Sequence, residues 1–265
     1  MKTILRFFTS TSLFTMAALV AGSAVAGEMK DAGKALPTHA ALSAALKAVV
    51  TGGSNSGFGL NMWATIVNRD GEVTAIAFSG ADRGDQWPGS RVISAQKANT
   101  ANAFSLPGLA LATANLYSAT QPGGSLFGLQ HSNPVDTGAA YKGPSENYGK
   151  PNDPLVGKKC GGVNVFGGGL ALYNAEGKLV GALGVSGDTS CTDHIIAWKI
   201  RHALNFDNVP AGVSATGDDN IVHDIVINGT GHPESPSGWG HPECGGGEKA
   251  IAAALPVTHP VGPNP

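Results

Sequence analysis

The residues best suited to chemistry lie near the end of the 265-residue chain, where His232, His241 and Cys244 fall within one segment rich in Gly and Pro. Imidazole nitrogens and thiolate sulfurs are common ligands of zinc, copper and iron, so these donors are compatible with a metal site. The sequence fixes no fourth ligand. The alternative, which we favour, is a Gly/Pro-rich tail with chance histidines and a cysteine that belongs to a disulfide.

Cys160, Cys191 and Cys244 are the three cysteines of the chain, an odd number. In an oxidising compartment we expect one disulfide and one remaining thiol, and the sequence allows three pairings. We favour Cys191–Cys244, which would tether the C-terminal extension to the rest of the chain. The alternative is that Cys160 or Cys244 serves as a metal ligand.

Several catalytic motifs are absent from the sequence, among them a nucleophile elbow, a phosphate-binding loop and the HExxH zinc motif. The formal net charge is −2, and the chain contains no basic run. This balance argues against nucleic acid or an anionic membrane as a partner. Only 14% of the residues are charged and 38 are glycine, which indicates many tight turns and Gly-rich loops.

The first 26 residues have the pattern of a secretory signal peptide. Lys2 and Arg6 are followed by a mostly apolar stretch, and Ala24 and Ala26 supply the small residues that a signal peptidase requires. A membrane anchor is the alternative, but the stretch is interrupted by Ser and Thr and is too short to span a bilayer. We therefore expect cleavage after Ala26, a periplasmic or secreted location, and no membrane insertion of the remaining chain.

The first half of the remaining chain alternates between helical and extended patterns. Thr38 is placed to cap a helix whose apolar residues continue to position 50. Two β-rich runs, 63–67 and 73–78, flank an Asn-Arg-Asp-Gly turn and predict a hairpin. Residues 93–104 and 109–118 predict two helices separated by Pro and Gly.

The second half begins with a long loop, 121–159. Residues 163–165, 170–173 and 178–185 then read as strands, and a last helix follows with Ser190 and Asp193 spaced as a capping box. Beyond residue 205 only 221–227 has a β-like pattern. Strands joined by short turns form antiparallel sheets, so we expect an α+β domain whose sheet is covered by helices.

Four segments together resemble a known family. They are Lys-Ala-Asn-Thr-Ala at 97–101, Gln-Pro-Gly-Gly-Ser-Leu-Phe-Gly-Leu-Gln at 121–130, Gly-Gly-Val at 161–163 and Val-Gly-Ala-Leu-Gly-Val-Ser-Gly at 180–187. Asp193 and Ala197 follow at the expected offset. This ordered set is similar to the GlcG/HbpS-like family of haem-binding proteins, which also includes the C-terminal domain of PduO-type proteins. The resemblance runs from about residue 42 to residue 204.

The resemblance implies a profilin-like fold, an antiparallel sheet flanked by helices, in a protein that often assembles into homo-oligomers. It implies haem as the ligand, in some members an iron ion or a corrinoid, and in some secreted members a sensor or transporter partner. We therefore divide the chain into a signal peptide (1–26), a haem-binding domain (27–204) and a Gly/Pro/His-rich extension (205–265). Residues 132–160 and 205–265 depart from the family pattern by their extra length.

Haem requires an apolar slot, axial donors and polar groups for its propionates. His131 directly follows a matched segment and is our first candidate for the axial ligand or for an iron ligand; the alternative is a solvated loop histidine. Cys160 is the thiolate alternative. Gly184 and Gly187 would allow the flat macrocycle to lie close to the backbone. The alternative is that they only permit a tight turn. No Cys-x-x-Cys-His motif is present, so bound haem would be non-covalent.

Basic residues could pair with the haem propionates. Lys97 lies in a matched segment and is preferred over Arg83 and Arg91, and the alternative is a solvated lysine. His194 and His202 share one face of the last helix and could meet a propionate or an iron ion. We favour instead a surface position for both, or a local hydrogen bond.

These patterns together predict an exported haem-binding protein that acts in haem or iron handling, more a binding protein than an enzyme. One alternative is a periplasmic redox accessory or haem-degrading enzyme. The other is a non-catalytic oligomeric partner of a sensor or transporter.

Overall fold

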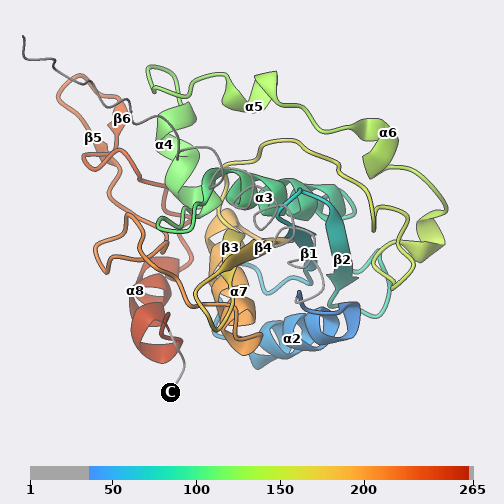
Figure 1. Cartoon of the computed structure of the whole chain (residues 1–265). Coiled ribbons are helices and arrows are strands. Elements are labelled where there is room, and N and C mark those ends of the chain that lie inside the picture. The colour runs from blue at the N-terminus through green and yellow to red at the C-terminus, as the bar shows by residue number, and fades with distance from the viewer. Residues whose placement is uncertain (1–35, 263–265) are drawn as a thin grey trace, which may run out of the picture.

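A four-stranded antiparallel sheet in the order β2–β1–β4–β3 lies at the centre of the molecule (Figure 1). The computed structural model describes residues 36–262, so the expected signal peptide lies outside the described residues. The strands are β1 (Trp63–Asn68), β2 (Val73–Phe78), β3 (Gly169–Tyr173) and β4 (Leu179–Ser186). Within the described part of the chain, no helix is long and apolar enough to cross a membrane.

Helices cover both faces of this sheet. Helix α3 (Ser90–Phe104) packs on one face, mainly on β4 and β1. Helices α2 (His39–Gly52) and α7 (Ser190–Ala203) pack on the other face, and α8 (Glu248–Thr258) lies against α7 (Figure 1). The expectation of an α+β fold with an antiparallel sheet flanked by helices is confirmed.

The two sides of the sheet form separate cores because side chains alternate along each strand. On β1, Trp63 and Val67 join the core beneath α3. The intervening Ala64 and Ile66 join the core shared with α2, α7 and α8. Both faces of the central strands are therefore buried, and nearly all of β1 and β4 is inaccessible to solvent.

The predicted helix start at Thr38 and the predicted hairpin are confirmed. The Thr38 hydroxyl accepts a hydrogen bond from the Ala41 N–H (3.3 Å), and β1 pairs with β2. Gly71 closes the turn with a φ of 74°, a left-handed conformation that glycine adopts readily. Helix α3 begins at Ser90, slightly earlier than expected.

The predicted helix over 109–118 is wrong. Residues 109–112 are extended because their backbone groups bond elsewhere, with the Ala110 N–H donating to the Ala211 carbonyl (2.8 Å) and the Leu111 N–H to the Ser105 hydroxyl (3.1 Å). Only the 3₁₀ turn η2 (Thr113–Leu116) and the single turn α4 (Tyr117–Thr120) are helical.

Two smaller expectations also fail. Residues 163–165 form no strand. The last helix is capped by Thr189, whose hydroxyl accepts from the Thr192 N–H (3.2 Å). Ser190 is instead the first helical residue, and the Asp193 carboxylate is engaged by Lys97 and by the backbone of Asp188.

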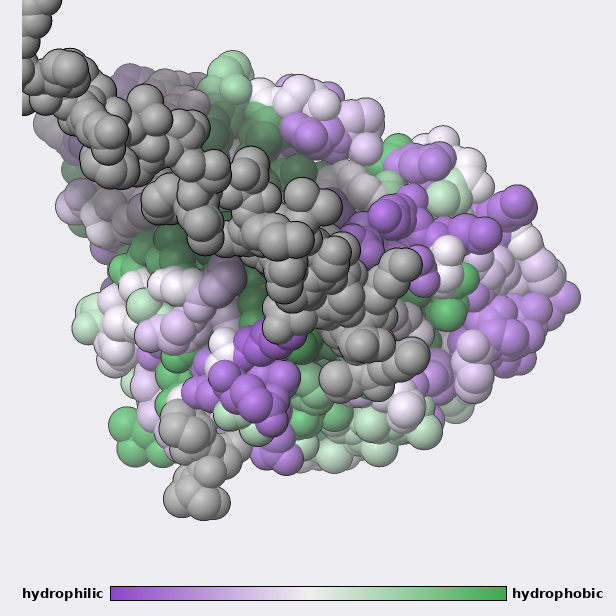
Figure 2. Space-filling model, in the orientation of Figure 1, coloured by the Kyte–Doolittle hydropathy of each residue, from purple (hydrophilic) through white to green (hydrophobic). Residues whose placement is uncertain are grey.

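The long loop contains only short helical turns: α5 (Leu129–Ser132), α6 (Thr137–Ala140) and η3 (Ser145–Asn147). Figure 2 shows hydrophilic residues gathered on the side of the molecule where α6 and the following segment lie. The end of the loop lies along the edge strand β2, where Val73 exchanges backbone hydrogen bonds with Gly157 (2.8 Å) and Lys158 (2.9 Å).

The opposite edge strand, β3, is also bonded to its surroundings. The Gly169 N–H donates to the Thr113 hydroxyl (2.9 Å), and the Ala171 carbonyl accepts from Arg201 Nη1 (3.1 Å). The Tyr173 N–H donates to the Phe206 carbonyl (2.9 Å).

The C-terminal extension has little regular structure and packs against the rest of the domain. It contains a small hairpin, β5 (Val226–Ile227) with β6 (Pro233–Glu234), and the helix α8. Ile221, Ala252 and Leu255 belong to the same core as α2 and α7.

Two cross-links also hold the extension to α7. The favoured disulfide, Cys191–Cys244, is present. Arg201 and Asp219 form a fully buried ion pair at 2.6 Å. The extension is therefore an integral part of the fold.

Candidate functional site

Lys97, expected at a haem propionate, lies buried at the end of β4. Its Nζ is 2.6 Å from Asp193 Oδ2 and donates a second hydrogen bond to the Val185 carbonyl (3.2 Å). The Asp193 carboxylate also accepts from the Asp188 N–H (3.0 Å). Burial raises the pKa of Asp193 to about 6, against the opposing effect of the Lys97 ammonium. Lys97 thus already has an anionic partner inside the protein.

Gly184 and Gly187 permit close packing within the protein. A Cβ at Gly184 would collide with the Ser94 carbonyl of α3 and lie 2.5 Å from the Ala98 nitrogen. At Gly187, where φ is 156°, a Cβ would lie 2.6 Å from the Asn61 carbonyl oxygen. Protein atoms already occupy the space beside both residues. Gly184 therefore allows α3 to pack closely on β4, and Gly187 allows a tight turn.

Cys160 is a buried free thiol. Burial raises its pKa to about 11, so the thiol stays protonated at neutral pH. The protonated, buried form is poorly suited to act as a thiolate ligand. It belongs to the core beneath α3, together with Val73, Val92 and Leu155.

His131 differs from these residues because its side chain is exposed. It lies in α5, and hydrogen bonds to residues 163–165 hold this turn in place. The Val165 N–H donates to Gln130 Oε1 (3.3 Å), and the Val163 N–H donates to the Asn133 carbonyl (3.1 Å). Among the described residues, no hydrogen-bond partner occupies the His131 ring.

An apolar surface lies beside α5. We call it the Tyr117 face, and Phe166, whose ring is 6.2 Å from that of Tyr117, is its most exposed member at 47%. The other members pack on buried Leu111, Leu116 and Val165. The Tyr117 face consists of Tyr117, Leu126, Val163, Phe166 and Trp239.

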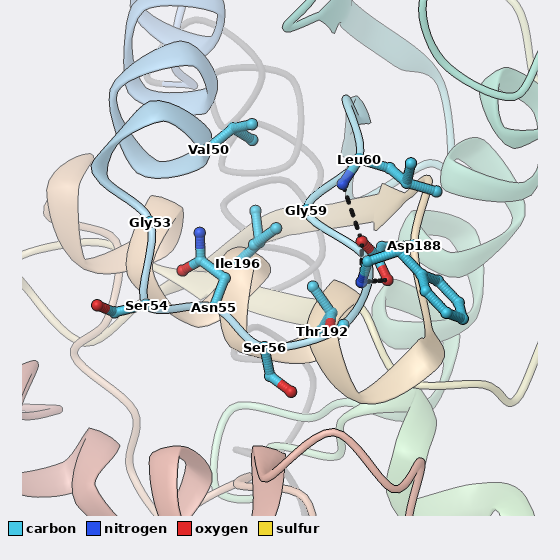
Figure 3. A pocket seen from close by; sticks show the side chains of 12 residues that line it. Val50, Gly53, Ser54, Asn55, Ser56, Gly59, Leu60, Asp188, Thr192 and Ile196 are labelled. Atoms are coloured by element: carbon cyan, nitrogen blue, oxygen red, sulfur yellow. Dashed lines mark hydrogen bonds between the residues drawn. The ribbon is translucent and has the colours of Figure 1, made fainter.

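A cavity of about 310 Å³ lies elsewhere, between the end of α2, the loop 53–60 and the start of α7 (Figure 3). The Asp188 carboxylate holds the loop by accepting from the N–H groups of Phe58 (2.9 Å) and Leu60 (3.0 Å). Ser54 and Ser56 have positive φ angles of 57° and 69°, which are unusual for residues other than glycine.

This cavity is a poor fit for haem. Its volume is at the lower end of the range for pockets that bury a drug-sized ligand, about 300–1,000 Å³. The residues that line it include no histidine or cysteine, and the Asp188 carboxylate already accepts several backbone hydrogen bonds. His131 offers an exposed imidazole, and the neighbouring Gln130 is bonded to Val165, on which the Tyr117 face packs.

The C-terminal donors are only partly brought together. Cys244 is bonded to Cys191, so its sulfur is not a thiolate while the disulfide is intact. His232 is exposed next to the β5–β6 hairpin, whereas His241 is buried against Tyr117 with ring centroids 5.2 Å apart. In the described part of the chain, His232 belongs to no group of three donors within 4.8 Å of one another.

The remaining basic candidates already have partners. Arg91 is buried in an ion pair with Asp153, whereas Arg83 is near Asp82 on the surface. His202 pairs with Asp207 at 2.6 Å. His194, expected at the surface or in a local hydrogen bond, is fully buried and accepts from the distant Ile221 N–H (3.1 Å).

The sequence analysis missed two residues that make important contacts, Asp188 and His223. Asp188 organises the cavity loop, and its only signal is its place in the short Gly187-Asp188 turn after β4, where a carboxylate can accept backbone hydrogen bonds. His223 contacts His241 with ring centroids 6.4 Å apart, but it sits within a β-like run that carries no ligand pattern.

Comparison with known proteins gives the following matches. Residues 36–201 match the model of a family described as haem degrading protein HbpS-like. A crystal structure of a PduOC–haem complex is 25% identical with a TM-score of 0.45, covering 64% of this chain and 96% of that chain. The Klebsiella pneumoniae protein ORFY is 24% identical with a TM-score of 0.43, covering 63% and 90%. No curated protein matches the chain.

Proposed function

The chain belongs to the HbpS-like family of haem degrading proteins, and from this premise we propose that it binds haem non-covalently and acts in haem or iron handling. The observation that carries the proposal is the family match, which spans residues 36–201 and therefore most of the sheet and the helices on it. Bound haem would supply an iron centre, and the protein would supply an axial donor and an apolar surface.

We assign the axial donor to His131. Its imidazole is exposed, and α5 is fixed against residues 163–165, next to the Tyr117 face. An imidazole ring can offer a nitrogen lone pair, and Phe166 offers an exposed aromatic surface. Lys97, Gly184, Gly187 and Cys160 are engaged inside the protein, so we do not include them in this proposal.

Export is a second part of the proposal. The N-terminal signal pattern and the Cys191–Cys244 disulfide both favour an oxidising location such as the periplasm or the exterior. The homo-oligomer and the sensor or transporter partner implied by the resemblance remain proposals as well.

A haemin titration tests the binding proposal. We expect a saturable shift of the Soret band with about one haem per chain, and at least about tenfold weaker binding by His131→Ala. The matched control is His232→Ala, because His232 is also exposed but lies in the turn before β6, outside α5 and the Tyr117 face. An unchanged titration with His131→Ala would reject His131 as the ligand, and the absence of any shift in the wild-type protein would reject haem binding.

Haem degradation is the second candidate, and the description of the family favours it. The discriminating measurement is turnover: the Soret band of the loaded protein is followed with a reductant and oxygen present. Steady loss of the band with release of iron would indicate an enzyme. A stable band would indicate a binding protein.

A further inference from the structure

Two imidazoles in the C-terminal extension, one buried and one half-buried, each have an inaccessible nitrogen without a hydrogen-bond partner. These atoms are Nε2 of His223 and Nε2 of His241. Both histidines lie beyond the stretch that matches the family, in the segment linked to α7 by the disulfide. An unpartnered buried polar atom is unfavourable, so the pair calls for an explanation.

The hydrogen bonds of the opposite ring nitrogens define the tautomers. His241 Nδ1 lies 2.8 Å from the Pro242 carbonyl oxygen, and His223 Nδ1 lies 3.3 Å from the His241 carbonyl oxygen. A carbonyl oxygen can only accept, so each Nδ1 carries the proton and each Nε2 presents a lone pair. This is the arrangement that orients histidines as metal ligands.

One sulfur donor lies close to both imidazoles. Cys191 Sγ, one ring nitrogen of His223 and one of His241 lie within 4.8 Å of one another. Cys244 Sγ is bonded to Cys191 Sγ, so reduction frees a second sulfur beside the first. Two thiolates and two imidazoles form a common tetrahedral ligand set for structural zinc.

We propose that reduction of the Cys191–Cys244 disulfide creates a zinc site from Cys191, Cys244, His223 and His241. The bound ion then replaces the disulfide as the link between α7 and the extension. With the disulfide intact, only the two imidazoles remain as donors, and zinc binds weakly. The extension thus carries two alternative cross-links at one place, and the supply of reductant selects between them.

The chemistry of the step balances with a phosphine or a dithiol as the reductant. A phosphine takes the oxygen of one water and becomes a phosphine oxide, while the S–S bond accepts two electrons and each sulfur gains a proton. Zn²⁺ then displaces both thiol protons as it binds.

Glu248 is not needed as a ligand. Its carboxylate also lies within 4.8 Å of the two sulfurs, but it accepts from the N–H groups of Cys244, Gly245 (3.0 Å) and Gly246 (2.7 Å). His194 Nε2 accepts from the Ile221 N–H, and although its Nδ1 has no hydrogen-bond partner, His194 belongs to no group of three donors among the described residues. Other contacts keep the extension docked when the disulfide opens, among them the buried Arg201–Asp219 pair.

The test uses the full mature protein with the probe Zn²⁺, in competition with a chromophoric chelator. We expect about one zinc per chain after phosphine reduction, and at least about tenfold weaker binding by the oxidised protein. Co²⁺ in place of zinc should give thiolate-to-metal charge-transfer absorption only after reduction.

The sequence provides a matched pair of variants, because His232 and His241 both precede Pro and Glu. His241→Gln should weaken zinc binding by at least about tenfold, while His232→Gln and Cys160→Ala should leave it unchanged. The double variant Cys191→Ser, Cys244→Ser lacks the disulfide without supplying thiolates. Zinc should raise the melting temperature of the reduced wild-type protein and have no effect on this variant.

Three results would overturn the proposal. The reduced wild-type protein could take up no zinc, or lose its fold in a way that added zinc does not restore. The oxidised protein could bind zinc as tightly as the reduced one. His241→Gln could bind as tightly as His232→Gln. None of these results depends on haem, so they are distinct from the tests of haem binding.

Discussion

The ammonium of Lys97 lies 2.6 Å from the carboxylate of Asp193 and joins α3 to α7, two helices on opposite faces of the sheet. Both side chains are almost fully buried. Removing one member of such a pair leaves the other charge buried without its partner, a loss of about 3–5 kcal/mol.

We therefore expect Lys97→Met to lower the free energy of unfolding by about 3–5 kcal/mol in urea at pH 7. The control is Lys249→Met, because Lys249 pairs with Glu243 on the surface, where an ion pair contributes less than about 1 kcal/mol. Similar losses in the two variants would show that the buried pair does not carry this stability.

Gly184→Ala tests the close approach of α3 to β4. The added methyl group would meet the Ser94 carbonyl, so we expect a loss of about 1–3 kcal/mol in the free energy of unfolding. Gly89→Ala is the control, because a Cβ there meets no atom within 4 Å. If haem occupied the side of β4 at Gly184, the same substitution would weaken haem binding without this loss of stability.

His194 should make stability depend on pH. Its pKa is lowered to about 3, mainly by burial, from an ordinary value of 6.5. The unfolded chain therefore takes up the proton first, and the contribution of neutral His194 is complete above pH 6.5 and lost as the pH falls from 6.5 toward 3. The slope from this one group is about 1.4 kcal/mol per pH unit.

His194→Gln should remove that slope, because glutamine does not titrate and its oxygen can still accept from the Ile221 N–H. The measurement is the free energy of unfolding between pH 4 and pH 7 for both proteins. Curves of equal slope would mean that His194 is not held neutral by the fold.

Cys160 should be unreactive in the folded protein. Raising the thiol pKa from 9.0 to about 11 lowers the thiolate fraction at pH 7.5 by about 100-fold, and burial blocks access as well. We expect iodoacetamide to modify Cys160 only in denaturant. Mass spectrometry of the treated protein measures the modification. Rapid modification of the native protein would instead show an accessible thiolate.

The sequence predicted the sheet and its main helices because their signals are local. The Asn-Arg-Asp-Gly turn, the Thr38 cap and the apolar spacing of α2 each depend on neighbouring residues alone. The wrong helix over 109–118 has a different cause. Its backbone groups bond to Ser105 and to the distant Ala211, a tertiary contact that local propensity does not contain.

The site was harder to predict for the same reason. Lys97 carries the positive charge expected of a propionate partner. Its actual partner, Asp193, lies 96 positions away in the sequence, so the sequence does not reveal the pair. His223 and His241 become neighbours only because Val222 and Gly240 form a bridge between separate segments of the extension. The favoured Cys191–Cys244 disulfide is confirmed, although the sequence alone allows three cysteine pairings.

The bonded edges of the sheet limit how copies of this protein can associate. Val73 on β2 already exchanges hydrogen bonds with 157–158, and three groups of β3 are engaged by Thr113, Arg201 and Phe206. A neighbouring chain cannot extend the sheet by strand addition at these positions, which also guards against edge-to-edge aggregation. An assembly that involves this part of the four-stranded sheet would therefore use side-chain surfaces rather than strand pairing.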